Sequence, residues 1–139
     1  MEARFTAVTL GVSDIARSVA FYEGLGLKAH TVMDDVAFID MNGAVLCLYT
    51  DLAKDAGVVS QRREIGLFAV AHNVREKGEV DAILAEAKAA GGSITRPAHE
   101  ADWGGRSGYF TDPDGNLWEI AWNPFWPLDE RGQVSLPES

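Results

Sequence analysis

Alternating apolar and polar residues predict a β-hairpin in the last third of the chain. Residues 107–123 contain two strand-like runs on either side of a turn. In the second run Trp118, Ile120 and Trp122 share one face, and Glu119 lies on the other face among smaller side chains. A carboxylate at the centre of a strand is costly to bury without a partner. The face that carries Glu119 is therefore predicted to be either exposed to solvent or part of a functional site.

The turn inside this hairpin carries its own signal. Asp112 can accept a hydrogen bond from the backbone two residues further on, Pro113 presets φ at the next position, and Gly115 supplies a positive φ. These residues predict a tight return of the chain.

The first half of the chain predicts the order β-α-β-β-β. Residues 4–12 alternate like a strand, and a helix is expected after them, with Ser13 as its N-cap residue and the glycines at positions 24 and 26 ending it. The dipeptide Asn42-Gly43 is a strong signal for a tight hairpin. Three short strands are expected over residues 28–34, 36–41 and 44–49.

The second half predicts the same order of elements. A strand is expected over residues 65–74, and apolar residues recur at helical spacing over residues 79–90. A strand over residues 93–97, a loop that contains Trp103 and the hairpin described above complete this half. The two halves also share a register, because Ala7 and Ala69 are separated by 62 residues (69 − 7), as are Val12 and Val74 (74 − 12). Two such units can each curl a sheet and share one cleft.

Composition narrows the classes of partner. The 139 residues fit one domain or two half-size repeats that share a core. Twelve basic and 21 acidic residues give a net charge of −9, which argues against a nucleic-acid or membrane partner and suits a cationic or neutral small ligand. The single cysteine, Cys47, excludes an internal disulfide and a thiolate metal cluster. Without a membrane-spanning run or the pattern of a signal peptide, a cytoplasmic location is expected.

Two motifs stand out: Ser-Asp-x-x-Arg-Ser-x-x-Phe-Tyr at residues 13–22 and Asp-Pro-Asp-Gly-x-x-x-Glu at residues 112–119. Together they resemble the vicinal oxygen chelate (VOC) superfamily, the group of glyoxalase I, bleomycin-resistance proteins, fosfomycin-resistance enzymes and extradiol dioxygenases. The resemblance covers roughly residues 4–124. It implies an α+β fold in which paired βαβββ modules form a cup-shaped, rolled mixed sheet, usually completed in a homodimer.

The resemblance divides residues 1–139, taken as a single VOC domain, into parts. These are a first βαβββ module at 4–50, a linker at 51–64, a second βαβββ module at 65–123 and a C-terminal tail at 124–139. The tail carries Phe125, Trp126 and Leu128 among prolines, so we expect it to fold over a cleft or a neighbouring subunit.

In metal-dependent members of this superfamily, ligands to the ion come from the first and last strands of each module. The resemblance places Ala7, Ala69, Cys47 (or a near neighbour) and Glu119 at these positions. Only Glu119 has a liganding side chain of the expected kind, because alanine has no lone pair to donate. We therefore expect no metal site and no cofactor, with a divalent ion recruited through Glu119 as the alternative.

Four residues are candidates for ligand contact. Glu119 is also the candidate catalytic acid or base, and its alternative is a solvated strand acid. Asn73 and Asn123 end strands on the predicted inner face, where they bind a ligand or cap backbone groups. Trp103 is a candidate lid, aromatic floor or dimer contact. His72 is expected, from strand parity, to point away from the cup.

These observations favour a glyoxalase/bleomycin-resistance-like protein that binds a small molecule without a metal and sequesters it. The missing metal ligands, the negative charge and the tryptophans all suit a cationic or aromatic ligand held in a homodimer. The alternative is a VOC-type enzyme, a lyase, isomerase or dioxygenase, that uses a divalent metal or Glu119 as acid or base. The residues alone leave open whether the protein is catalytic.

Overall fold

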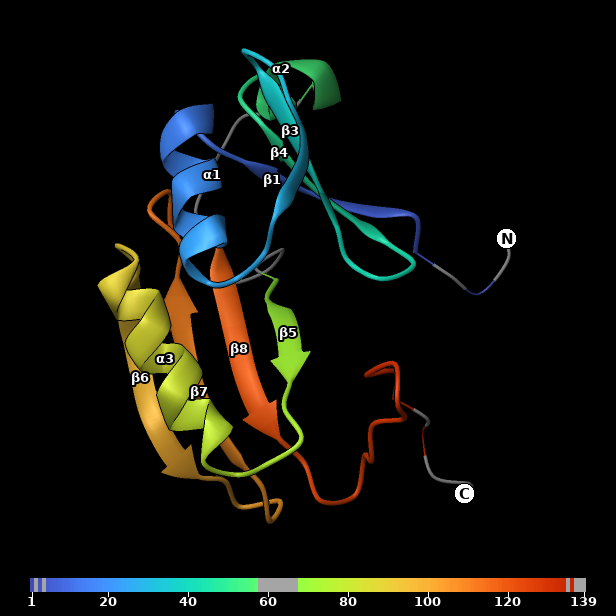
Figure 1. Ribbon diagram of the computed structural model, residues 1–139, viewed down its shortest axis with the longest axis vertical. Coiled ribbons are helices and arrows are strands. Elements are labelled where there is room, and N and C mark those ends of the chain that lie inside the picture. Colours follow the sequence, from blue (N-terminus) through green and yellow to red (C-terminus); the bar gives the residue numbers. More distant parts are fainter. Residues whose placement is uncertain (2, 4, 58–67, 135, 137–139) are drawn as a thin grey trace.

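The computed structural model describes residues 1, 3, 5–57, 68–134 and 136, and it has an α+β architecture (Figure 1). In chain order the elements are β1 (Ala7–Gly11), α1 (Ile15–Gly24), β2 (Ala29–Val32), β3 (Val36–Asp40), β4 (Val45–Tyr49), α2 (Leu52–Ala56), β5 (Val70–Asn73), α3 (Glu79–Ala89), β6 (Ser93–Glu100), β7 (Arg106–Thr111) and β8 (Leu117–Trp122). Among these helices, none is long and apolar enough to cross a membrane.

The strands form two four-stranded mixed sheets with the same topology. The first has the strand order β1-β4-β3-β2 and the second β5-β8-β7-β6. In each sheet the first strand pairs parallel to the last strand of its module, and the remaining pairs are antiparallel. The predicted paired βαβββ fold is therefore confirmed.

The internal repeat extends to single hydrogen bonds. The backbone N–H of Val12 donates to the carbonyl of Tyr49 at 3.1 Å, and that of Val74 donates to the carbonyl of Ala121 at 2.9 Å. Both valines are buried just beyond the first strand of their module. Half of the predicted linker, residues 58–64, and the predicted start of the second module, residues 65–67, lie outside the described residues, and α2 lies in the part of the linker that is described.

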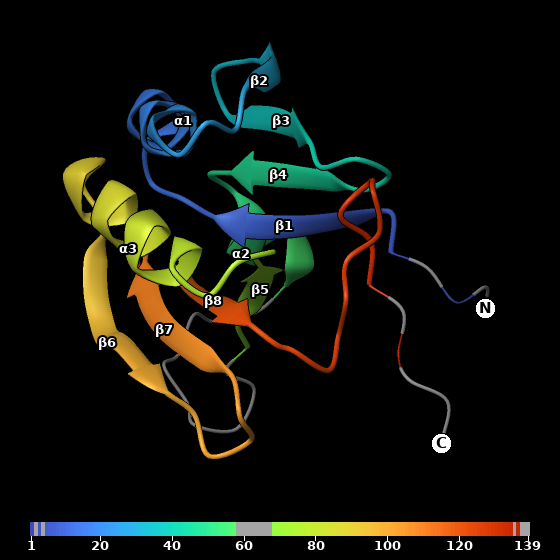
Figure 2. The same ribbon diagram turned by 60° about the horizontal axis from the view of Figure 1, so that its bottom comes forward.

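One hydrophobic core joins the two modules. Helix α1 lies against the first sheet and α3 against the second, and the two helices lie next to each other (Figures 1 and 2). Buried side chains from both sheets and both helices belong to a single cluster. The rings of Phe21 and Tyr22 on α1 contact those of Phe110 and Trp118 in the second sheet, with centroids 6.1 and 6.0 Å apart.

The face of each sheet that points away from α1 or α3, which we call its open face, is only partly covered; on the first sheet α2 contacts β1, with Leu52 beside Gly11. On β1, Leu10 is 1% exposed and faces the core, whereas Ala7 and Gly11, on the opposite face, are exposed. Ala69 is also exposed, directly before β5. The structure therefore provides two open sheet faces, and the alanines at the metal-ligand positions lie on that side.

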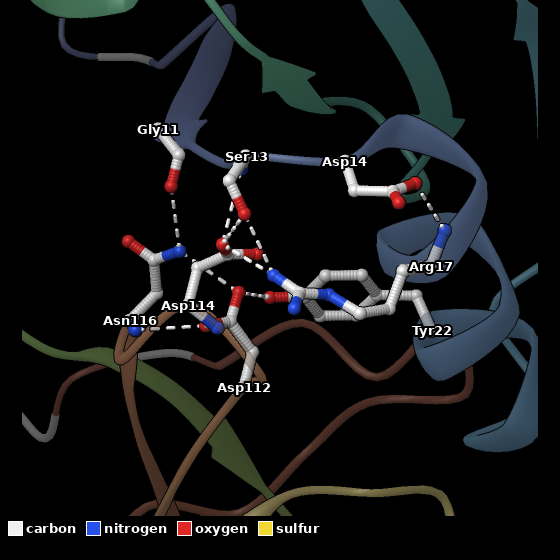
Figure 3. A network of polar contacts seen from close by, with 8 residues as sticks. All are labelled: Gly11, Ser13, Asp14, Arg17, Tyr22, Asp112, Asp114 and Asn116. Carbon is white, nitrogen blue, oxygen red and sulfur yellow. Dashed lines mark hydrogen bonds and ion pairs between the residues drawn. The ribbon is translucent and has the colours of Figure 1, made fainter.

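A network of polar contacts connects the two modules, and we call it the intermodule network (Figure 3). Its members are Gly11, Ser13, Asp14, Arg17, Tyr22, Asp112, Asp114 and Asn116. The Asp114 Oδ1 atom accepts three hydrogen bonds, from the backbone N–H of Ser13 at 3.0 Å, from its hydroxyl at 2.7 Å and from Arg17 Nη2 at 2.8 Å. A hydrogen bond of 3.1 Å, donated by the side-chain amide of Asn116 to the backbone carbonyl of Gly11, further links the two modules.

The buried half of the network is centred on Asp112, which is 3% exposed. Its Oδ2 accepts a hydrogen bond from the Tyr22 hydroxyl at 2.7 Å, and its Oδ1 accepts from the backbone N–H groups of Asp114 and Asn116. Trp118 Nε1 in turn donates to the Tyr22 oxygen at 3.2 Å. Burial and the neighbouring Asp112 charge raise the pKa of Tyr22, so the phenol stays a donor.

The network corrects one sequence expectation. Ser13 is not the N-cap of α1, because its hydroxyl and its N–H both bind Asp114. Asp14 caps the helix instead, with Oδ1 accepting from the backbone N–H of Arg17 at 2.9 Å. The expected turns do form: Asn42 and Gly43 both have positive φ, as a tight hairpin requires, and Gly115 has φ 87°.

The described part of the C-terminal tail makes its hydrogen bonds with other parts of the same chain. Arg75 donates to the carbonyls of Leu128 and Glu130, both at 3.4 Å, and the Asn42 amide donates to the carbonyl of Arg131 at 2.8 Å. The tail therefore runs from the end of β8 to the β3–β4 turn of the first module (Figure 2). Phe125 stays exposed on it.

We expect Tyr22→Phe to lower the free energy of unfolding by about 1–3 kcal/mol, because buried groups of Asp112 and Trp118 lose a partner. Urea denaturation measures this loss. Tyr49→Phe is the matched control, since Tyr49 also donates to a carboxylate, that of Asp55, but outside the core. The control should lose much less, and an equal loss in both variants would contradict the importance of the network.

Candidate functional site

A pocket of about 250 Å³ lies on the open face of the second sheet. Strands β6, β7 and β8 form its floor, and the β6–β7 loop, residues 101–105, forms one wall. The pocket is lined by Arg96, His99, Glu100, Ala101, Asp102, Trp103, Ser107, Tyr109 and Glu119. Two of these residues, Glu119 and Trp103, are among the ligand-contact candidates predicted from the sequence.

Strand register places the polar side chains in rows across the sheet. Arg96, Tyr109 and Glu119 are cross-strand partners on β6, β7 and β8, and the row ends at Ala71 on β5. Paired residues project from the same face of a sheet, so these three side chains share the open face. Ala71 has only a methyl group beside Glu119 at this end of the row.

Tyr109 and Glu119 interact as cross-strand partners on β7 and β8. The pKa of Tyr109 is raised, first by burial, then by the Glu119 charge and by hydrogen bonding to Glu119. Arg96 opposes this shift by lowering the same pKa. The pair therefore offers a ligand a phenol oxygen and a carboxylate that still has free lone pairs.

His99 presents an acceptor nitrogen. Its Nδ1 lies 3.1 Å from the carbonyl oxygen of Pro97. Because a carbonyl only accepts, Nδ1 carries the proton and the neutral ring keeps its lone pair on Nε2. Strand β6 extends to Glu100, three residues beyond the expected end, and this brings the His99 ring into the pocket wall.

Trp103 lies on the loop that forms one wall of the pocket, and the position of its side chain depends on the glycines that follow it. A Cβ atom at Gly105 would lie 1.8 Å from the Trp103 ring, so only glycine lets the indole fold back over the loop. The loop is closed by a hydrogen bond from the Ala101 N–H to the Gly105 carbonyl at 2.8 Å. The ring of Phe125 packs against Gly104 from the tail. Trp103 itself remains 45% exposed, which leaves an indole surface for a ligand.

Ion pairs hold the base of this loop against α3. Arg106 donates two hydrogen bonds of 2.8 Å to Asp81 and contacts Glu100 at 3.4 Å. Lys77 pairs with Glu100 at 2.8 Å. The hydrogen bond from Arg106 lowers the pKa of Asp81, and the one from Lys77 lowers the pKa of Glu100. The carboxylate of Glu100 is thus already engaged in ion pairs with Lys77 and Arg106.

The two asparagines named from the sequence have different surroundings. Asn73 lies on the open face beside Ala121, diagonal to Glu119, but outside the pocket lining. Asn123 Oδ1 accepts a hydrogen bond from the backbone N–H of Phe125 at 2.9 Å, which is the capping alternative considered for it. His72 is the cross-strand partner of buried Ile120 and so points away from the open face, as expected; desolvation lowers its pKa more than Glu79 raises it.

Sequence reasoning missed Arg96, Ser107 and Tyr109. Ser107 and Tyr109 had a usable signal, because strand parity puts them on the Glu119 face once the hairpin is registered. Arg96 had none, because β6 contains register shifts after Ile94 and after Arg96 that change which residues face the pocket.

The residues do not fit the divalent ion that metal-dependent relatives bind. Ala7 and Ala69 contribute no donor atoms. Cys47 lies on the other sheet and is 8% exposed, and burial raises the pKa of its thiol, which disfavours a thiolate ligand. In the described part of the chain, no three His, Cys, Asp or Glu side chains gather in a way that could hold a metal. Of the four superfamily ligand positions, only that of Glu119 carries a ligand of the expected kind.

Comparison with known proteins defines the family. Residues 4–120 match the model of the Glyoxalase/Bleomycin resistance protein/Dioxygenase superfamily, and the chain belongs to this superfamily. It is similar to a glyoxalase-related enzyme from Fulvimarina pelagi, with 39% identity, coverage of 99% of this chain and 100% of that one, and a TM-score of 0.89.

Two more distant structures show the shared fold. A glyoxalase/bleomycin resistance protein/dioxygenase family enzyme from Burkholderia phytofirmans is 20% identical over 86% of this chain and 98% of its own, with a TM-score of 0.74. Lactoylglutathione lyase from Agrobacterium tumefaciens is 21% identical over 93% of this chain and 100% of its own, with a TM-score of 0.69.

We expect Arg106→Gln to raise the pKa of Asp81 toward the ordinary aspartate value of about 3.9. Carboxyl NMR titration measures this shift. Lys77→Gln is the control and should instead raise the pKa of Glu100. Because both pKa values are lowered in the folded state, the stability that these pairs contribute is present above pH about 4 and is lost as the pH falls below it. An unchanged Asp81 titration in Arg106→Gln would show that the pair does not form in solution.

Proposed function

We propose that the protein binds a small molecule in the Glu119 pocket without a metal and sequesters it. The observation that carries this proposal is the combination of an aromatic wall at Trp103 with a Glu119–Tyr109 pair on a sheet face whose metal-ligand positions are alanines. Binding pockets typically combine apolar surface with a few placed polar groups. A volume of about 250 Å³ suits a ligand smaller than a typical drug.

A cationic or aromatic group on the ligand suits the pocket. The exposed indole of Trp103 can stack on a ring or lie against a cation. Glu119 supplies a carboxylate for a charge-assisted hydrogen bond from an ammonium. The net charge of −9 attracts cations toward the whole molecule.

Proton transfer by Glu119 is the second candidate function, and the lone pair on His99 Nε2 favours it. A carboxylate, a phenol and an imidazole in one pocket are the usual partners in metal-independent acid–base catalysis. NMR spectra of a bound ligand separate the two functions, because a sequestered ligand is recovered unchanged whereas a substrate is converted.

We also propose that the protein works as a homodimer. The open face of the first sheet carries exposed Ala7 together with half-buried Phe38 and Tyr49, and α2 covers only part of it, with Leu52 beside Gly11 and Asp55 bonded to Tyr49. Sedimentation velocity should give a mass of twice 15.0 kDa. A monomer at all concentrations would contradict the dimer without affecting the pocket.

We expect phenethylamine, a cation with one aromatic ring, to bind the wild-type protein and to change its tryptophan fluorescence. Dialysis against EDTA should leave the affinity unchanged. Glu119→Gln should weaken binding about tenfold or more, because a hydrogen bond to a charged group contributes roughly 1.5 kcal/mol or more.

Glu86→Gln, which removes an exposed acid on α3, is the matched control and should bind normally. Trp103→Phe should remove most of the fluorescence change if the indole is the pocket wall. Loss of binding in EDTA, with recovery on adding a divalent ion, would contradict metal-independent binding and favour the metal-dependent enzyme.

A further inference from the structure

The pocket contains a guanidinium that the described chain does not neutralise. Arg96 is exposed on β6, and it forms no hydrogen bond or ion pair with any described residue. Other arginines of the chain are engaged: Arg17 pairs with Asp114, and Arg106 pairs with Asp81 and Glu100. The one recorded interaction of Arg96 is its electrostatic effect on Tyr109, which places its charge close to the pocket floor.

The opposite charge lies at the other end of the same row. Arg96, Tyr109 and Glu119 occupy three successive strands, so two strand spacings, or about 10 Å, separate the backbones of the two charged residues. They form no ion pair within 4.0 Å, and Tyr109 occupies the strand between them, where Glu119 raises its pKa and Arg96 lowers it. The cation and the anion are therefore unpaired with each other, each with capacity for a ligand group.

Two charges that are unpaired with each other in one pocket match a ligand that carries both signs. A guanidinium forms two parallel hydrogen bonds with a carboxylate, a geometry that a lone ammonium cannot use. A carboxylate such as Glu119 accepts from an ammonium. An α-amino acid carries its ammonium and its carboxylate on the same carbon, so one small molecule presents both charged groups to the two ends of this row. Glu100 does not compete, because Lys77 and Arg106 already hold it.

We propose that the ligand is a small zwitterion with an aromatic or apolar side chain, its carboxylate bound by Arg96, its ammonium by Glu119 and its side chain packed on Trp103. This assignment rests on the proposed function, because it takes the pocket to be the ligand site. His99 Nε2 accepts a second hydrogen bond from the ammonium. Arg96 is thus the residue that selects zwitterions over simple amines.

Three probes with the same phenyl ring test this assignment: phenylalanine, phenethylamine and 3-phenylpropanoate. Their affinities are measured at pH 7 by titration of backbone amide NMR signals. Wild-type protein should bind phenylalanine at least about tenfold more tightly than either of the other two, since each singly charged probe leaves one pocket charge without a partner.

Two variants assign the charges. Arg96→Gln should reduce the affinity for phenylalanine to that for phenethylamine and leave phenethylamine binding undiminished. Glu119→Gln should reduce it to that for 3-phenylpropanoate. Arg96→Lys, which keeps the charge but loses the planar fork, should give an intermediate affinity. Lys88→Gln removes an exposed cation on α3 and is the matched control, with no expected change. Because Arg96 makes no contact that the described fold needs, its variants should keep the wild-type NMR spectrum.

The outcomes separate the two proposals. Phenethylamine binding as tightly as phenylalanine, with Arg96→Gln having no effect, would overturn the zwitterion assignment and keep the pocket as a cation site. Amide shifts confined to residues away from the pocket, or no binding of any probe, would overturn both the assignment and the proposed site.

Discussion

Two aspartates on one turn hold the modules of this protein together. Asp112 and Asp114 accept hydrogen bonds from the start and the interior of α1, and the bond from Ser13 to Asp114 joins residues 101 positions apart in the chain. Asp112 is nearly fully buried, so its charge is tolerable only because backbone N–H groups and the Tyr22 hydroxyl surround it. The remaining architecture depends on this satisfied carboxylate.

The position of this network explains where the pocket lies. It fixes α1 against the second module on the helix side, where the aromatic rings of both halves form a shared core. Both sheets consequently turn their other faces outward, and the polar row through Tyr109 and Glu119 lies on one of these faces. Stabilising residues and candidate ligand residues thus occupy opposite sides of the same hairpin, β7–β8.

The sequence predicted what depends on local patterns and failed where geometry is set at longer range. Alternation and turn chemistry identified the repeat, the hairpins and the face of Glu119, because each is decided within a few residues. The role of Ser13 was wrong because its partner, Asp114, is distant in sequence and outcompetes the local helix cap. Arg96 was missed because bulges in β6 break strand parity, and the alternation of apolar and polar residues does not locate these bulges.

The close approach of the Trp103 ring to Gly105 also constrains how this family can diversify. Any side chain at position 105 would meet both the indole and the backbone carbonyl of Trp122, so glycine is required there whatever residue stands at position 103. Position 105 should therefore stay glycine among homologues, and exchanges at position 103 alone would remodel the rim of the cup while the rest of the scaffold is inherited intact. Ligand preference can in this way change through substitutions in one loop, without a change to the sheet beneath it.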